Sequence, residues 1–398
     1  MAKSNGKSNS KSQSKAHGKA HAKSHAKRNH EINDDLTAKQ DAKHRAVRKS
    51  YPGFDDSVLE RAEYWSEMTA DLEGLSQERA MGLLSLRYAM ASSDLPRVEF
   101  WHDPDNIDIT EDIAYLPDGG MSADEVRGHL LDLYLPHDAV VRGGHTTPVY
   151  IDIHGGGFTY GYKELNRNFN THLAEQGFAV FSLNYRPAPQ TNLRGQLADI
   201  QAALVWIRDH IAKFPVNPDA VFITGDSAGA ALAALTLAIE NSDTAAKAFG
   251  IDQASGIGFA GGALISGVYN LTGRSALEPP AEGNADDEAS DRHLENNLGK
   301  EFFADLEDAI PFLSSASLAR SVNLPPLFLI TSSDDFIEAE TLELAAALSR
   351  QGADFELHDV KTTRTQSLGH VFPVCMTWLE ESQDALAAIR DFSYERIR

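Results

Sequence analysis

Residues 220–239, AVFITGDSAGAALAALTLAI, constrain the fold of this chain more than any other stretch. An apolar run of strand character leads directly into GDSAG at 225–229, and an alanine-rich run of helical length follows. Between a strand and a helix, the pattern Gly-x-Ser-x-Gly is typical of a turn so sharp that side chains at the glycine positions would collide with backbone. We therefore expect Ser227 to stand at the carboxyl end of a strand as a nucleophile.

Short strand-like runs recur along the chain around this central one. We expect eight strands, at 107–116, 126–136, 148–154, 178–185, 220–225, 262–267, 325–332 and 354–360. The first two are joined by a short segment rich in turn residues, which favours antiparallel pairing. Helix-length segments separate most of the later ones, which favours parallel crossovers. The sequence predicts one α/β domain with an eight-stranded, mostly parallel sheet flanked by helices.

Changes in composition divide the chain into segments. Residues 1–50 are low in complexity, and the first thirty carry eight Lys or Arg and no acidic residue, so we expect a disordered basic tail. Helical periodicity predicts an N-terminal helical segment over 51–100, before the main domain at 101–398. The polar connection at about 270–320 is longer than most loops, which favours a lid.

Charge and cysteine content exclude several classes of protein. The chain has 58 Asp and Glu against 36 Lys and Arg, and the acidic main domain disfavours binding to nucleic acid or anionic membranes. No apolar run reaches the roughly 18 residues of a membrane span, and the basic N-terminus lacks the apolar core of a secretory signal. The one cysteine, Cys375, permits no intrachain disulfide. We expect a cytoplasmic protein.

A nucleophilic serine needs a base to take its proton and an acid to orient that base. On a sheet of this kind the acid follows a late strand and the histidine follows the last one. His370 is the only histidine after the last expected strand and is the candidate base. The loop after 325–332 offers two adjacent acids, Asp334 and Asp335, which point in different directions, and both are candidates.

The run HGGG at 154–157 follows the third expected strand. When a serine attacks a carbonyl, negative charge collects on the carbonyl oxygen, and preorganised N–H donors stabilise it. Glycines let such donors approach without side chains in the way. We expect an oxyanion hole formed by the N–H groups of Gly156, Gly157 and Ala228.

Five segments occur in the order and spacing of one family's motifs, namely HGGGFTYGYKEL, NYRPAPQ, LADIQAALVWIRDHIAKF, GDSAG and LGHVF. By these the sequence, over about 110–390, resembles the hormone-sensitive-lipase-like α/β hydrolases and the related carbohydrate, feruloyl-type and carboxyl esterases. The resemblance implies an α/β-hydrolase fold with a helical cap built partly from N-terminal helices. It also favours Asp335, because DFIEAE fits the family's Asp-Pro-Leu-x-Asp-Glu pattern best, with Phe336 in place of proline.

The resemblance further implies a serine carboxylesterase that acts on small or aromatic acyl esters through an acyl-enzyme intermediate. No cofactor and no metal are expected, the partner is a small-molecule ester, and a homo-oligomer is compatible with the sequence. Two alternatives stay open. One is a binding module on the same fold that has lost catalysis, and the other is an acyltransferase that uses the same Ser, Asp and His.

Overall fold

The structure is a computed structural model, and it describes residues 69–72, 74–117, 128–142, 144–271, 298–363 and 366–397. These residues form one eight-stranded sheet, as the sequence predicts. The strands are β1 (Ile107–Ala114), β2 (Leu130–Pro136), β3 (Thr147–Ile153), β4 (Ala179–Leu183), β5 (Val216–Asp226), β6 (Phe259–Ile265), β7 (Leu327–Ser332) and β8 (Phe355–Val360).

The strand order in the sheet is β1-β2-β4-β3-β5-β6-β7-β8. β2 runs antiparallel to both of its neighbours, β1 and β4, and the remaining pairs are parallel. The expected antiparallel pairing of the first two strands is therefore confirmed. Parallel strands end at the same edge of a sheet, so the loops after β3, β5, β7 and β8 emerge together.

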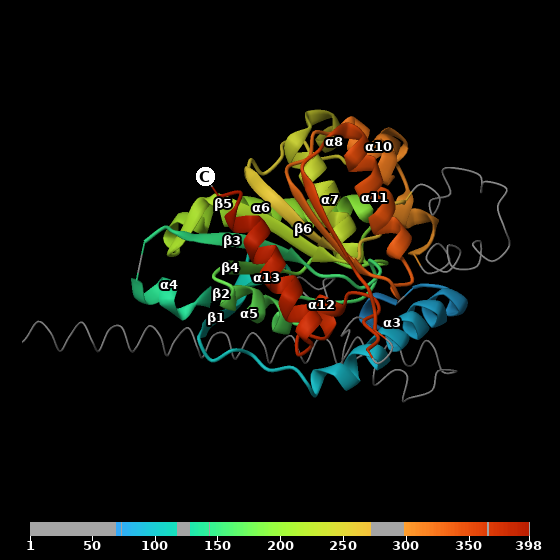
Figure 1. The fold of residues 1–398 in the computed structure, drawn as a ribbon. Coiled ribbons are helices and arrows are strands. Elements are labelled where there is room, and N and C mark those ends of the chain that lie inside the picture. Colours follow the sequence, from blue (N-terminus) through green and yellow to red (C-terminus); the bar gives the residue numbers. More distant parts are fainter. Residues whose placement is uncertain are drawn as a thin grey trace, which may run out of the picture.

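Helices cover both faces of the sheet. Figure 1 shows α13 (Glu380–Tyr394) and α5 (Arg167–Glu175) on one face, and α6 (Leu193–His210) and α7 (Ala228–Asn241) on the other. The remaining helices are α3 (Gln77–Val98), α4 (His137–Arg142), α8 (Asp243–Ala248), α10 (Ser315–Ser321), α11 (Glu338–Gln351) and α12 (Phe372–Cys375), with 3₁₀ turns η1 (Thr69–Leu72), η3 (Ile211–Lys213), η5 (Lys300–Phe303) and η6 (Glu307–Phe312).

The two faces of the sheet bury separate apolar clusters, and β3 shows why. Val149, Ile151 and Ile153 point to the face covered by α6 and α7, whereas Tyr150 points to the opposite face. There the Tyr150 hydroxyl lies 2.7 Å from the hydroxyl of Ser393 on α13. Side chains alternate along a strand, so β3, in which consecutive residues from Pro148 to Ile153 are buried, packs on both faces. This double burial makes β3, β4 and β5 a rigid base for the loops at their carboxyl ends.

α3 precedes the sheet in sequence and lies beyond the end of it in space (Figure 1). It begins after Ser76, whose hydroxyl accepts a hydrogen bond from the N–H of Arg79 at 3.3 Å. It lies within the helical segment expected over 51–100. The first part of that segment, up to residue 68, lies outside the described residues, as do the tail at 1–50 and residues 272–297 of the connection expected to be a lid. None of the described helices is long and apolar enough to cross a membrane.

Candidate active site

Ser227 lies between β5 and α7 in a strained backbone conformation, with φ 52° and ψ −119°. The residues two positions before and two positions after it must be glycines. A Cβ atom at Gly225 would lie 2.5 Å from the carbonyl oxygen of Gly229, and one at Gly229 would lie 2.0 Å from that of Ile153. A non-glycine residue held in such a conformation costs on the order of 1–3 kcal/mol, and strain of this kind is concentrated at functional sites. The serine side chain is thereby lifted out of the end of the sheet.

His370 and Asp335 lie together at the same edge of the sheet. Asp335 follows β7 and is buried, and His370 follows β8. The Nδ1 atom of His370 lies 2.9 Å from Oδ1 of Asp335. Burial opposes ionisation of Asp335, but the hydrogen bond and charge of His370 outweigh it and lower the pKa of the carboxyl. Because Asp335 binds Nδ1, the other ring nitrogen of His370, Nε2, can exchange a proton with a neighbouring group.

The adjacent carboxylate of Asp334 has different partners. It accepts hydrogen bonds from the backbone N–H groups of Leu368 and Gly369 at 3.1 and 2.8 Å. It also accepts one from the hydroxyl of Ser367 at 2.7 Å. Asp335 therefore contacts the ring of His370, whereas Asp334 holds the loop that precedes it. Of the two acids left open by the residues alone, only Asp335 is placed against the histidine.

The glycine loop after β3 approaches Ser227 in a conformation that favours glycine. Gly156 and Gly157 have φ values of +111° and +57°. A Cβ at Gly156 would lie 2.0 Å from the carbonyl oxygen of Tyr160, so the close approach of backbone leaves no room for a side chain. Ala228, the third expected donor, is the buried first residue of α7, directly after Ser227. The three expected oxyanion donors thus belong to segments that meet at the serine.

A buried polar network joins the glycine loop to the serine turn. Oδ1 of Asp226 accepts hydrogen bonds from the N–H of Gly155 at 2.9 Å and from Nδ2 of Asn166 at 2.8 Å. The same amide lies 3.2 Å from Oδ1 of Asp152. Burial raises the pKa of Asp226, and it raises that of Asp152 to about 7. This network was not predicted. Its one sequence signal is an acidic residue directly before the serine, and nothing indicates the partner Asn166.

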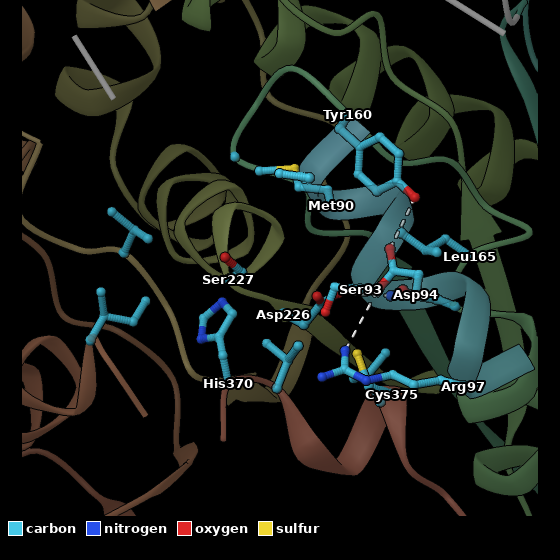
Figure 2. Close-up of a pocket in the computed structure, with 18 of the residues that line it drawn as sticks. Met90, Ser93, Asp94, Arg97, Tyr160, Leu165, Asp226, Ser227, His370 and Cys375 are labelled. Atoms are coloured by element: carbon cyan, nitrogen blue, oxygen red, sulfur yellow. Dashed lines mark hydrogen bonds and ion pairs between the residues drawn. The ribbon is translucent and has the colours of Figure 1, made fainter. Parts of the chain in front are cut away.

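The residues around Ser227 line a cavity of about 350 Å³. Figure 2 shows Ser227 and His370 on one side of this cavity and side chains of α3, among them Met90, Asp94 and Arg97, on the other. Gly156 and Gly157 also line it, so the candidate nucleophile, base and oxyanion loop face one space. A cavity of this size suits a small molecule.

Phe336 forms part of the cavity wall next to His370. Its ring is 80% exposed, and its centroid lies 4.6 Å from that of the His370 ring. This is the position at which the resembling family has proline. An exposed aromatic side chain at the rim gives the cavity an apolar edge on the histidine side.

α3 is anchored to the glycine loop by Arg87, whose side chain is fully buried. Its guanidinium forms two hydrogen bonds with the carboxylate of Asp71, at 2.9 and 2.8 Å. It also donates to the carbonyl oxygens of Thr159 at 2.9 Å and Ala188 at 3.1 Å. A second contact lies beyond the C-terminal end of the helix, where the indole N–H of Trp101 donates to the carbonyl of Cys375 at 3.0 Å. Sequence reasoning missed both contacts.

We expect Arg87→Met to lower the free energy of unfolding by about 3 kcal/mol, because it removes the buried guanidinium that pairs with the carboxylate of Asp71 and donates to two backbone carbonyls. Urea unfolding followed by circular dichroism measures this. The exposed residue Arg350 on α11 supplies the matched control, Arg350→Met, with a change within about 0.5 kcal/mol. The double variant Asp71→Leu with Arg87→Met should recover part of the loss. If Arg87→Met is as stable as the control, the anchoring role is wrong.

Comparisons with known proteins agree on one family for this chain. Residues 150–373, more than half of the chain, match the family model described as the alpha/beta hydrolase fold. Esterase LipQ of Mycobacterium tuberculosis is 27% identical over 286 residues, which make up 71% of this chain and 61% of LipQ. The chain therefore spans about three fifths of the length of that relative.

Solved structures that are similar to this chain support the same family. Esterase B from Lactobacillus rhamnosis has a TM-score of 0.64 at 26% identity, over 81% of this chain and 100% of that one. The same esterase inhibited with a C4-C4 SN3 tributyrin phosphonate also has a TM-score of 0.64, at 25% identity, over 80% of this chain and 98% of that one. The family model runs from β3, before the glycine loop, to beyond the loop that carries His370, and the chain therefore belongs to the α/β hydrolase fold family, as its sequence predicts.

Proposed function

We propose that this protein is a serine carboxylesterase in which Ser227, His370 and Asp335 act together. The observation that carries the proposal is that a strained serine and a histidine paired with a buried carboxylate at 2.9 Å line the same cavity. A nucleophile, a base and an orienting acid are the three parts that ester hydrolysis by a serine requires.

Each residue has a defined part in the proposed reaction. Ser227 Oγ attacks the ester carbonyl carbon while Nε2 of His370 takes its proton. Asp335 accepts the hydrogen bond from Nδ1, which fixes the tautomer and stabilises the imidazolium. The N–H groups of Gly156, Gly157 and Ala228 stabilise the developing oxyanion. The alcohol leaves with the proton from His370, and water, activated by the same base, then attacks the acyl-enzyme and releases the acid.

The comparisons support this proposal. LipQ is named an esterase, and the structure of esterase B includes a phosphonate inhibitor. Tetrahedral phosphorus resembles the tetrahedral intermediate of acyl transfer, and enzymes bind such analogues tightly because they are complementary to the transition state. We propose the same chemistry for this chain, with small or aromatic acyl esters as substrates, and with α3 as part of a cap over the site. A cytoplasmic location, proposed from the lone cysteine, agrees with this role.

The proposal is tested by turnover of p-nitrophenyl acetate by the purified chain. We expect release of p-nitrophenol well above the background rate, and a panel of acetyl, butyryl, octanoyl and feruloyl esters should then rank the acyl groups. Absence of turnover with every ester would favour a binding module. An acyltransferase would instead form more transfer product than free acid when an added alcohol competes with water.

A further inference from the structure

One face of α3 lies over the proposed nucleophile, and its polarity changes along the helix. Met90, Asp94 and Arg97 line the cavity and are spaced by four and three residues, as expected for one helix face, and Ser93 lies beside them. Met90 lies at the glycine loop, where a Cβ on Gly157 would be 3.0 Å from its terminal methyl group. Arg97 lies seven residues further on, about 10 Å along the helix axis. The cavity roof is thus apolar at one end and charged at the other.

Asp94 forms the acceptor of the charged end. It is only 9% exposed, and its carboxylate accepts a hydrogen bond from the hydroxyl of Tyr160 at 2.9 Å. Burial raises the pKa of Asp94 to about 6, and the hydrogen bond from Tyr160 and the charge of Arg97 act in the opposite direction. At neutral pH a carboxylate therefore faces the interior of the cavity.

Arg97 forms the donor of the charged end. Its Nη1 atom lies 3.6 Å from Oδ1 of Asp94, which is an ion pair but too long for a good hydrogen bond. Within the described part of the chain this is its one ion pair. Its side chain is 27% exposed, and Figure 2 shows the guanidinium directed into the cavity beside Cys375. Its planar fork of N–H groups can therefore donate to a bound molecule.

Apart from the hydrogen bond that Asp94 accepts from Tyr160, the ion pair of Asp94 and Arg97 contributes little to the stability of the fold. Apolar side chains of similar size would serve a buried position at least as well, because the cost of removing two charges from water offsets their attraction. The charges of Asp94 and Arg97 balance each other, so a charged ligand group would face one like charge. A hydroxyl group carries no charge and meets no such repulsion. It can donate a hydrogen bond to the carboxylate and accept one from the guanidinium at the same time.

We propose that Asp94 and Arg97 bind a hydroxyl group of the substrate, so that the site selects esters that carry a hydroxyl over matched esters that lack one. This inference rests on the proposed esterase function. The hydroxyl can belong to the acid half or to the alcohol half of the ester. The apolar side chains of Met90, Leu165 and Val374, which line the same cavity, accommodate the hydrocarbon part.

Two matched pairs of substrates distinguish these sources. Methyl 3-hydroxybutyrate against methyl butyrate tests the acid half, and glycerol 1-monobutyrate against propyl butyrate tests the alcohol half. Each kcat/KM is divided by the rate of alkaline hydrolysis of the same ester, which removes intrinsic reactivity. We expect the hydroxylated ester of one pair to be preferred about tenfold, the effect of one hydrogen bond to a charged group.

Variants then assign that preference to the pair. Arg97→Met and Asp94→Leu should each lower the ratio and the double variant should bring it close to one, whereas the exposed control Arg350→Met should leave it unchanged. If Arg97→Met does not fold, Arg97→Lys retains the charge without the planar fork and should lower the ratio in part. A wild-type ratio near one in both pairs overturns the inference, as does a ratio that survives both variants. Neither result affects the esterase proposal. If none of the four esters is hydrolysed, the esterase proposal itself is contradicted.

Discussion

Ser227→Ala should lower kcat for p-nitrophenyl acetate by on the order of 10⁴-fold or more, to the level left by binding and the oxyanion donors alone. The loss is this large because the serine forms the covalent intermediate, and no other group can take its place. Alanine retains the Cβ atom, so the strained turn between β5 and α7 should form as before. Steady-state kinetics measures the loss, and circular dichroism confirms that the variant is folded.

His370→Ala should cause a loss of similar size, and the double variant should be little worse than either single one. Residues of a triad act as a unit, so removal of one leaves the others without a function in catalysis. Ser349→Ala, at an exposed position of α11, is the matched control and should retain full activity. Retention of more than about a hundredth of the wild-type kcat by Ser227→Ala or His370→Ala contradicts the assignment.

Asp335→Asn should lower kcat by on the order of 10⁴-fold, whereas Asp334→Asn should lower it far less. The amide at 335 can donate to Nδ1 of His370, which lies 2.9 Å from the carboxylate, and this would place the ring proton on the nitrogen that must act as the base. The amide at 334 keeps an oxygen that can accept from the N–H of Gly369. The substitution Asp334→Asn should therefore only weaken the hydrogen bonds that hold the loop before His370.

The two neighbouring carboxylates serve as controls for each other, because both substitutions remove one charge at nearly the same place in the chain. Kinetics of both variants should be compared at one pH on the alkaline side of the activity profile, where the base is unprotonated. A larger loss for Asp334→Asn than for Asp335→Asn would show that the acid was assigned to the wrong residue of the pair.

The sequence predicts the sheet and the serine turn well, because both depend on local patterns. Apolar runs with turn or helix-length spacers identify the strands, and steric exclusion explains the glycines beside Ser227. The choice between Asp334 and Asp335 is different, since adjacent side chains diverge and one residue of register decides which meets His370. The family pattern favoured Asp335 in spite of Phe336, and the hydrogen bond to His370 places the same residue there.

Long-range polar contacts could not be predicted. Arg87 donates to the carbonyl of Thr159, which lies 72 residues away in the chain, and a backbone carbonyl has no signature in sequence. A charged residue within a helix that is otherwise partly apolar was the only sign of this contact. Asn166 presents the same difficulty, since an amide between two buried carboxylates is indistinguishable in sequence from a surface residue.

The contacts that join α3 to two loops of the site make movement of this helix costly. Arg87 fixes the helix to the glycine loop, and Trp101, just beyond its end, fixes it to Cys375 after the histidine loop. To swing α3 aside, the protein would have to break a buried ion pair and separate the two loops that the reaction needs. On the opposite rim lies the exposed side chain of Phe336, beside His370, and a rotation of this one side chain would change the shape of that rim. Among the described residues, the side chain at the rim can therefore move at a lower energetic cost than the helix above the nucleophile.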